Sequence, residues 1–466
     1  MTLSKSRLLA HLQCPKRLWL EVNAPLLKED SAAIEAAYAA GNRLGEVARE
    51  LFDANGLGHT FDWKVDGVAS VVAQTQAAIK STRKKLSRRA SLFEAAFEAG
   101  GARVFVDVLL PMLGPVGGPD EVPRWGIVEV KSASSMQDVY LDDAAIQYYA
   151  ATMAGLPLDS IFIAHINKGW VYEGDGCYDG LLNTVDVTQE IQERVRCMPI
   201  FIERAQATLK RRTAPTIRTG AQCSDPYPCG FLEHCQSSEP VVKHPVQWLR
   251  GAKTNVLREH LAKPKVKDMR DVPDALLNVL HLRVKKATLS GRKWLDARGA
   301  AAVLAAHMMP CYFLDFETIG DVVPRWAGTT PYQPVPFQFS LHTIGARGGL
   351  QHQAFLDLSG DDPRLKLARA LVKTCGTKGA VFAYNAKFEA GCLESLAEHF
   401  ANRPKLAKAL RSIKTRLVDL LPIVRDHFYH PLQQGRFGLK SVLPALLPEL
   451  SYESLDGVSN GMDAQI

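Results

Sequence analysis

Four cysteines enclose the first half of this chain and constrain how it can fold. Cys14 lies near the start, whereas Cys223, Cys229 and Cys235 follow much later, with five residues between neighbours. Four thiolates are enough to bind one metal centre, either a tetrahedral zinc ion or an iron–sulfur cluster. If all four share one centre, the two ends of a domain that closes near residue 240 must meet there.

The composition limits the class of protein. The chain has 466 residues, enough for two or three domains with separate cores, and 47% of them are apolar. No stretch approaches the roughly 20 apolar residues that span a bilayer, and no secretory signal pattern opens the chain. We therefore expect a cytoplasmic protein with no membrane partner, whose nine cysteines are thiols or metal ligands rather than disulfides.

The net charge of +7 is concentrated in two places. Residues 250–298 hold 13 Lys and Arg against 5 Asp and Glu, and a second basic cluster lies at 83–89. Each cluster is explained equally well by a solvated helix face. A nucleic acid is the natural partner if a nuclease site is present, because neutralising phosphates gives affinity without sequence specificity.

The order of apolar runs and Pro/Gly breaks predicts a mixed α/β chain in three parts. Residues 1–240 read as helices followed by three strands, a helix and a strand, closed by the cysteine triplet. Residues 241–305 read as a basic helical connector interrupted by prolines, and 306–466 read as a second α/β domain. The strands expected in the first domain are 94–97, 103–110, 126–130 and 160–166, with a helix over 142–153.

The first candidate site combines two carboxylates and a lysine. Asp107 lies in one predicted strand, and Glu129 and Lys131 lie two residues apart in the next, on one face of it. Mg²⁺ prefers oxygen ligands, so Asp107 and Glu129 can hold it while Lys131 stands beside a metal-bound water. Gln147, on the following helix, can orient the site. Glu-x-Lys alone is also common on exposed strands, so the surrounding residues carry the prediction.

These residues resemble a known superfamily. Val106-Asp107, Val128-Glu129-Val130-Lys131-Ser132 and Ile146-Gln147-Tyr148-Tyr149 are similar to the motifs of PD-(D/E)XK nucleases. The resemblance covers residues 1–240 and is strongest to the RecB-type branch, which includes the CRISPR-associated iron–sulfur exonucleases and the AddB helicase–nuclease subunit. It implies a restriction-endonuclease-like fold in which Asp107 and Glu129 bind Mg²⁺ or Mn²⁺ and Lys131 is catalytic.

One position departs from that pattern. Many members of the branch carry a histidine metal ligand on an early helix, whereas this chain has Gly45-Glu46 there. We expect Glu46 to replace the ligand, although a plain surface residue explains it equally well. The resemblance also implies that Cys14, Cys223, Cys229 and Cys235 bind a structural 4Fe-4S cluster, with zinc as the alternative.

A second candidate site lies in the C-terminal half. Asp315 and Glu317 are two residues apart in one predicted strand, an arrangement that suits two-metal phosphodiester cleavage. Asn385 and Glu389 follow a later strand and open a helix. Together these positions resemble the first two motifs of DnaQ-like (DEDD) 3′→5′ exonucleases, with Glu389 where Asp is usual. That resemblance implies a ribonuclease H-like fold in which Asp315 and Glu317 hold metal.

The end of the chain affects this second site. The segments 331–342 and 435–444 resemble an uncharacterised bacterial family that carries such a domain behind a RecB-like nuclease. The third exonuclease motif should supply a fourth acid on a late helix, and the sequence stops before it, with Asp463 as a weak substitute. We therefore expect a truncated form that lacks one metal ligand.

The sequence thus predicts a Mg²⁺- or Mn²⁺-dependent deoxyribonuclease, an exonuclease by resemblance. Its expected substrate is single-stranded or ended DNA, with RNA left open, and roles in DNA repair, defence or mobile-element processing all fit. No Gly-x-x-x-x-Gly-Lys-Ser/Thr loop is present, so a helicase would be a separate partner. Two alternatives stay open, a non-catalytic nucleic-acid-binding protein and a sensor that uses the cluster as a redox switch.

Overall fold

The computed structural model describes residues 1–29, 32–53, 55–82, 90–112, 124–307 and 309–450, and for 32–38 and 82 it describes only the backbone. The basic cluster at 83–89 and Asp463 lie outside these residues. The chain forms two compact units, one of residues 1–239 with 321–332, and one of residues 240–320 with 333–466. Both units mix helices and sheets, which confirms the expected α/β class.

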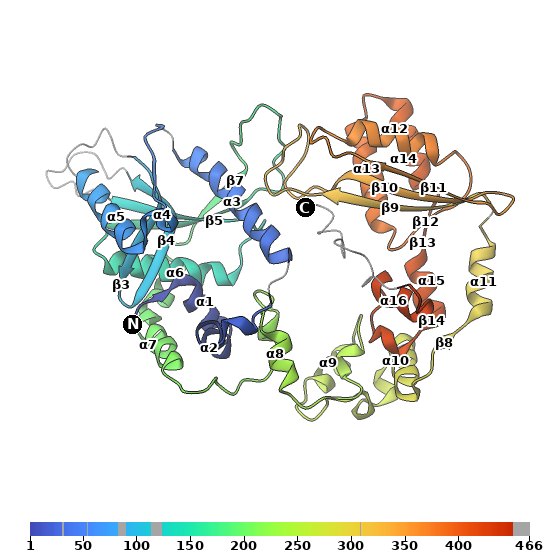
Figure 1. Ribbon diagram of the computed structural model, residues 1–466, viewed down its shortest axis with the longest axis horizontal. Helices are drawn as coiled ribbons and strands as arrows, with labels where there is room; N and C mark the ends of the chain where they lie inside the picture. The colour runs from blue at the N-terminus through green and yellow to red at the C-terminus, as the bar shows by residue number, and fades with distance from the viewer. Residues whose placement is uncertain (30–31, 54, 83–89, 113–123, 308, 451–466) are drawn as a thin grey trace. The chain divides into compact units, whose positions relative to one another are not determined.

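The first unit is built around a seven-stranded sheet (Figure 1). The strand order is β2-β3-β4-β5-β6-β7, and β1 pairs with β4. Strands β3, β4 and β5 are antiparallel neighbours, and β5 and β6 run parallel. Gly100 and Gly101 both have positive φ, as a two-residue turn between β3 and β4 requires. The strands are β1 Leu3–Ser4, β2 His59–Thr60, β3 Leu92–Ala99, β4 Ala102–Met112, β5 Arg124–Lys131, β6 Leu158–Ile166 and β7 Leu182–Asp186.

Helices cover both faces of this sheet. Successive side chains of a strand point to opposite faces, and here both faces carry apolar residues. Ile161 and Ile163 of β6 belong to the main core, which α6 and α7 close, whereas Ala164 belongs to a smaller core on the other face. Leu44 and Val47 of α3 lie in a further core with Ile166 of β6. The helices are α1 Lys5–Gln13, α2 Pro15–Asn23, α3 Ala32–Phe52, α4 Trp63–Asp66, α5 Val68–Thr82, α6 Asp138–Met153, α7 Gln192–Leu209 and α8 Leu232–Ser237.

Residues 321–332 complete the first unit although they are distant in sequence. We call this segment the 321–332 loop. Val322 and Val323 are 4% and 5% exposed and share a core with Leu44 and Val47. The sequence did not predict this insertion, because no local pattern tells which sheet a loop will contact.

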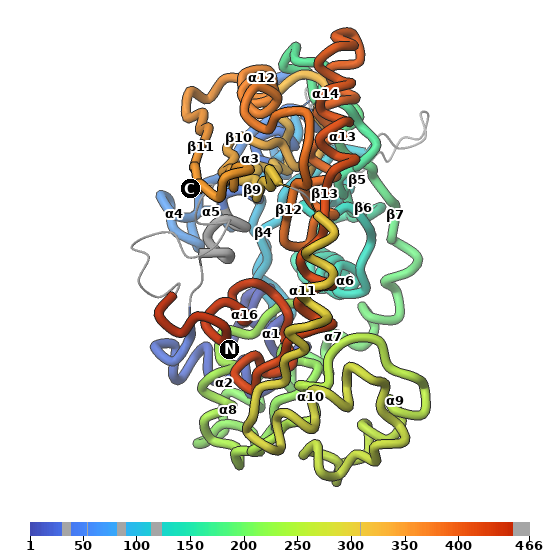
Figure 2. The backbone as a smooth tube through the Cα atoms, turned by 90° about the vertical axis from the view of Figure 1, so that its right-hand side faces the viewer, coloured from blue at the N-terminus to red at the C-terminus, as the bar shows by residue number. Residues whose placement is uncertain are grey.

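The second unit contains a five-stranded sheet in the order β11-β10-β9-β12-β13. Strands β9, β10 and β11 are antiparallel, and β12 runs parallel to β9 and β13. Helices α12, α13 and α14 share a core with β9 and β10 (Figures 1 and 2). The strands are β9 Cys311–Ile319, β10 Val335–Ile344, β11 Leu350–Leu356, β12 Val381–Ala383 and β13 Leu417–Asp419, and the helices are α12 Arg364–Thr374, α13 Lys387–His399, α14 Pro404–Lys414, α15 Leu420–His427 and α16 Leu439–Leu446.

The segment expected as a connector, 241–305, packs as part of the second unit. Its helices are α9 Asn255–Leu261, α10 Val279–Ser290 and α11 Ala297–Ala305, and its strand β8 Trp294–Leu295 pairs with β14 Phe428–Tyr429. Leu249 and Met269 are fully buried with Tyr429, whose hydroxyl lies 3.2 Å from Thr288 Oγ1. The segment therefore has a core of its own.

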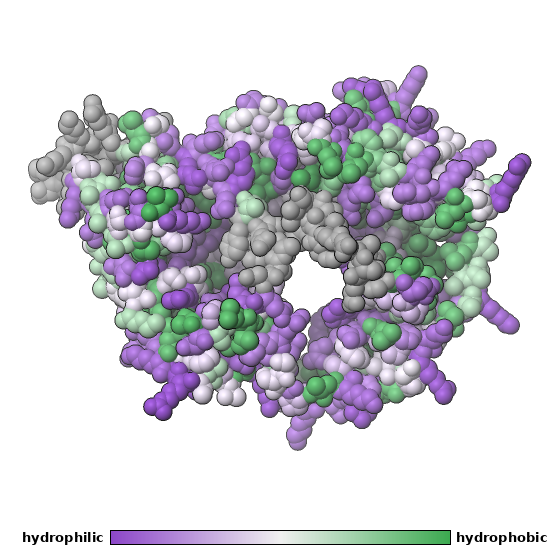
Figure 3. Space-filling model, viewed as in Figure 1, coloured by the Kyte–Doolittle hydropathy of each residue, from purple (hydrophilic) through white to green (hydrophobic). Residues whose placement is uncertain are grey.

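The surface agrees with the composition. On the face shown in Figure 3, hydrophobic residues are scattered among hydrophilic ones. Within the described ranges, no helix is long and apolar enough to cross a membrane.

Candidate functional site

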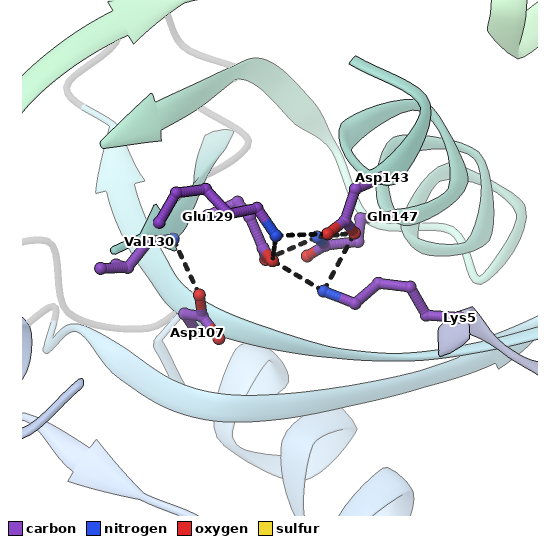
Figure 4. A network of polar contacts seen from close by, with 7 residues as sticks. Lys5, Asp107, Glu129, Val130, Asp143 and Gln147 are labelled. Atoms are coloured by element: carbon purple, nitrogen blue, oxygen red, sulfur yellow. Dashed lines mark hydrogen bonds and ion pairs between the residues drawn. The ribbon is translucent and has the colours of Figure 1, made fainter. Parts of the chain in front are cut away.

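Asp107, Glu129 and Lys131 meet where β4 and β5 pair. Val108 is paired with Val128, so the two carboxylates lie on adjacent strands at neighbouring positions. Asp107 Oδ2 accepts a hydrogen bond of 2.8 Å from the Val130 amide. Lys131 Nζ donates to Glu129 Oε1 at 2.7 Å. Figure 4 shows the Glu129 carboxylate pointing toward Asp143 and Gln147, whereas Asp107 lies under Val130.

Helix α6 adds two polar side chains one turn apart. Gln147 is fully buried and donates through Nε2 to Glu129 Oε2 at 2.6 Å and to Asp143 Oδ1 at 3.0 Å. Asp143, which is 3% exposed, also accepts from Lys131 at 2.5 Å. The structure therefore brings the predicted Gln147 to Glu129. Asp143 was not predicted, although its position four residues before Gln147 places it on the same helix face.

Lys5 was also missed, and it completes the network. It is the first residue of α1, and its Nζ lies 2.8 Å from Glu129 Oε1 and 3.0 Å from Asp143 Oδ1 (Figure 4). Two lysines and two carboxylates thus balance their charges in a largely buried cluster. No spacing rule links Lys5 to residues more than a hundred positions away, so no sequence signal was available.

Burial and the neighbouring charges shift the pKa values of these groups. Burial raises the pKa of Asp107 to about 8, and the negative charge of Glu129 adds to the shift. Burial lowers the pKa of Lys131, but the charges of Asp143 and Glu129 outweigh it and hold that pKa well above its usual range. The charges of Lys131 and Lys5 likewise hold the pKa of Asp143 below its usual range, against the effect of burial. At neutral pH Asp107 is therefore largely protonated, and Lys131 stays cationic.

A cleft of about 540 Å³ opens beside the network. Asp107, Lys131 and Ser132 line it on the sheet side, and one face of α3, from Gly41 to Arg49, lines the other. Glu46 also lines the cleft, but it forms an ion pair of 2.8 Å with Arg43. The expected replacement of a histidine ligand by Glu46 thus stays a prediction, because the side chain is held by its neighbour.

Glu94 is a further acid of this cleft that the sequence did not indicate. It has φ of 58° within β3, where the pairing to β4 skips the position opposite Asp107. Arg49 Nη1 lies 4.0 Å away, and burial raises the pKa of Glu94. A non-glycine residue held at positive φ is uncommon and is often found at functional sites.

The donor set around Asp107 and Glu129 suits a hard cation in its chemistry, since both offer carboxylate oxygens. As placed, however, both oxygens of Glu129 accept hydrogen bonds from Lys5, Lys131 and Gln147. Among the described residues, no three His, Cys, Asp or Glu side chains are close enough to hold a metal ion together. A cation would therefore have to displace at least one of these N–H donors from Glu129.

The four cysteines of the sequence pattern line one cavity. Cys14 stands between α1 and α2, and Cys223, Cys229 and Cys235 surround it from the other end of the unit. Burial raises the pKa of the Cys229 thiol. Thiols gathered around one cavity are ligands that either an iron–sulfur cluster or a zinc ion accepts. Cys177, by contrast, is exposed and lies elsewhere.

The second candidate site gathers acids along β9 and its neighbours. Asp315 and Glu317 lie on β9, and burial raises the pKa of Glu317, with a smaller contribution from the charge of Asp315. Glu389 of α13 is 3% exposed, and its Oε2 has no hydrogen-bond partner in the part of the chain that the structure describes. Burial raises its pKa to about 7, and the charges of Asp315 and Asp419 add to this.

Asp419 is a fourth acid near this site. It ends β13, and its Oδ1 accepts from the Asn385 amide and the Leu421 amide, both at 2.9 Å. Asn385 has φ of 66°, so the turn between β12 and α13 is bent sharply where Asp419 caps it.

A comparison with known protein families gives a match in the C-terminal half of the chain. Residues 312–438 match a domain of unknown function, DUF2779, which covers Asp315, Glu317, Glu389 and Asp419. No curated protein matches the chain. The match covers little more than a quarter of the sequence, and the description of the domain names no activity.

Proposed function

We propose that the protein is a Mg²⁺- or Mn²⁺-dependent nuclease that hydrolyses phosphodiester bonds of DNA. In this proposal residues 1–240 form a RecB-like PD-(D/E)XK nuclease, and residues 306–466 form a DnaQ-like module. The observation that carries it is the convergence of Asp107, Glu129, Lys131 and Gln147 at one junction of β4, β5 and α6.

Each residue of the first site has a separate role in this proposal. Asp107 and Glu129 would hold the metal, which supplies a water of lowered pKa and a Lewis acid for the phosphate. Lys131 stays protonated, so it suits stabilising negative charge on the phosphate better than removing a proton. Gln147 fixes the Glu129 carboxylate through its 2.6 Å hydrogen bond.

The four-cysteine cavity would hold a 4Fe-4S cluster, with zinc as the alternative. The cluster would tie Cys14 to the segment that carries Cys223, Cys229 and Cys235. Such a thiol-based centre fits a reducing compartment such as the cytoplasm. In the second unit, Asp315 and Glu317 would hold metal and Glu389 would complete an exonuclease-like site.

The proposed substrate is single-stranded or ended DNA, with RNA as a further substrate to test and a separate helicase as a partner. End-labelled single- and double-stranded DNA and RNA should be incubated with Mg²⁺ or Mn²⁺. Lys131→Ala should abolish cleavage by the first site, and Asp315→Asn with Glu317→Gln should abolish any cleavage by the second. Lys168→Ala, at an exposed position, is the matched control.

One observation favours an alternative. Glu129 is saturated with N–H donors, which is what a purely structural ion cluster would also show. If purified, metal-loaded protein binds nucleic acid but cleaves no substrate, the protein is a non-catalytic nucleic-acid-binding protein. Cleavage unaffected by Lys131→Ala would likewise remove the first site from the mechanism.

A further inference from the structure

The 321–332 loop is anchored to the first unit at several points. Its ends close on each other, because the Tyr332 amide donates to Asp321 O at 2.8 Å. Val322 and Val323 are buried in the core that includes Leu44 of α3. Thr329, 3% exposed, bridges to Tyr172, whose amide donates to Thr329 O at 2.9 Å. The loop is thus a compact, packed element of the first unit.

The loop contacts the strand end that carries Lys131 on both sides of that residue. Val130, just before Lys131, packs against the core that contains Val322 and Val323. Ser132, just after it, accepts a hydrogen bond from the Tyr332 hydroxyl through its backbone oxygen. Ser132 also lines the cleft with Asp107 and Lys131. The two residues that flank Lys131 are therefore both held by the loop.

Tyr332 itself is held in an unusual backbone conformation. Its φ is 61°, a value that costs a bulky residue energy and that is retained only where contacts enforce it. It lies near Tyr140, whose ring is 5.3 Å from Lys131 Nζ. The side chain thus stands at the rim of the carboxylate network.

We propose that Tyr332 is a positioning residue of the first candidate site, and that the 321–332 loop completes that site. This inference rests on the proposed nuclease function of the first unit. Lys131 can act on a phosphate only if its backbone is fixed relative to Asp107 and Glu129. The ladder to β6 holds Lys131, and the Ile166 amide of β6 donates to Ala133 O at 2.9 Å; between these two points the Ser132 carbonyl is held by the Tyr332 hydroxyl.

The test compares three variants with the full-length protein. Tyr332→Phe removes only the hydroxyl that donates a hydrogen bond to the Ser132 backbone oxygen. Val323→Ala weakens the packing of the loop without placing a charge in the core. Tyr384→Phe is the matched control, because its hydroxyl donates to the Phe437 backbone oxygen in the second unit. For each variant we would measure kcat and KM on end-labelled DNA, melting temperature, and hydrogen–deuterium exchange of the peptide spanning 129–135.

For Tyr332→Phe we expect kcat to fall about tenfold, because small displacements of catalytic groups are costly, with KM within twofold and an unchanged melting temperature. Exchange at 129–135 should rise in Tyr332→Phe and in Val323→Ala, and stay unchanged in Tyr384→Phe. Unchanged kcat and unchanged exchange in both loop variants would overturn the inference. If the wild type cleaves nothing, the proposed function fails, and exchange at 129–135 alone decides whether the loop holds this strand end.

Discussion

At the scale of single residues, Lys5, Glu129, Lys131 and Asp143 form one network of ion pairs. Its ion pairs satisfy every charge without a metal, which makes the site stable but occupies the carboxylate that a metal would need. Asp107 stands beside it as a neutral acid at pH 7. In the proposed nuclease, metal binding would therefore have to remove a proton from Asp107 and rearrange the donors on Glu129.

This arrangement predicts a pH-dependent metal affinity. The Asp107 pKa of about 8 lies above that of a free carboxyl, so the acid is protonated below pH 8 and ionised above it. Mn²⁺ affinity should fall about tenfold per pH unit below pH 8 and level off above it, with one proton released per ion bound. Calorimetry in two buffers of different ionisation enthalpy measures that proton. Asp107→Asn should remove the pH dependence; an affinity that is flat from pH 6 to 9 would contradict the assignment.

Lys5 gives a prediction for stability. In Lys5→Met, Lys131 is the one lysine of this network that still pairs with Glu129 and Asp143. One buried negative charge therefore loses its partner. We expect a loss of about 2 kcal/mol in the free energy of unfolding of the first unit, reduced from the range for fully buried pairs because Lys5 is partly exposed. Urea denaturation measures it, with Lys168→Met, at an exposed position of the first unit, as control. In a double-mutant cycle, Asp143→Asn should recover part of the loss; full additivity would argue against the network.

At the scale of elements, sequence reasoning succeeded where neighbours in the chain are neighbours in the sheet. Asp107, Glu129 and Gln147 meet because β4, β5 and α6 follow one another, so spacing and alternation were sufficient. Lys5 and Tyr332 come from segments far away in the chain, and their contacts depend on tertiary packing that no local pattern encodes. The burial of Leu249, in the segment 241–305, likewise depends on Tyr429 near the end of the chain, which no local pattern indicates.

One such long-range contact depends on a glycine. Gly435 has φ of 74°, and a Cβ there would lie 1.8 Å from Trp248 O, which cannot move without disturbing the core around Tyr429. Gly435→Ala should destabilise the second unit by at least about 2 kcal/mol more than Gly291→Ala, whose φ is 68° but whose surroundings are open. Amide exchange in urea, followed on peptides of the second unit, measures both. Equal effects of the two substitutions would show that residues 240–250 can move far enough to accommodate the added Cβ.

At the scale of the whole molecule, each unit is built from segments that are far apart in sequence. The first unit includes residues 321–332, which lie between β9 and β10 in the sequence. In the second unit, residues 240–305 pack against residues 428–437. In the first unit, the N-terminal hairpin of α1 and α2 also closes on residues 211–235. Gln13 Nε2 donates to Gln222 O and Tyr227 O, both at 2.7 Å, beside the cysteine cavity. A metal centre in the cavity, as proposed, would therefore strengthen this long-range closure of the first unit.

The cysteine cavity therefore sets the last prediction. Because α1 carries Lys5 at one end and ends at Cys14 at the other, loss of the cluster should loosen both the cavity and the carboxylate network. Protein purified without oxygen should contain about four irons per chain and show broad visible absorption. Cys14→Ser should lose the iron, lower the melting temperature of the first unit and speed amide exchange over α1, whereas Cys177→Ser, exposed and outside the cavity, should change none of these. Finding one zinc ion per chain instead of iron would show that the cysteines bind a tetrahedral zinc ion. Iron retained in Cys14→Ser would exclude Cys14 as a ligand.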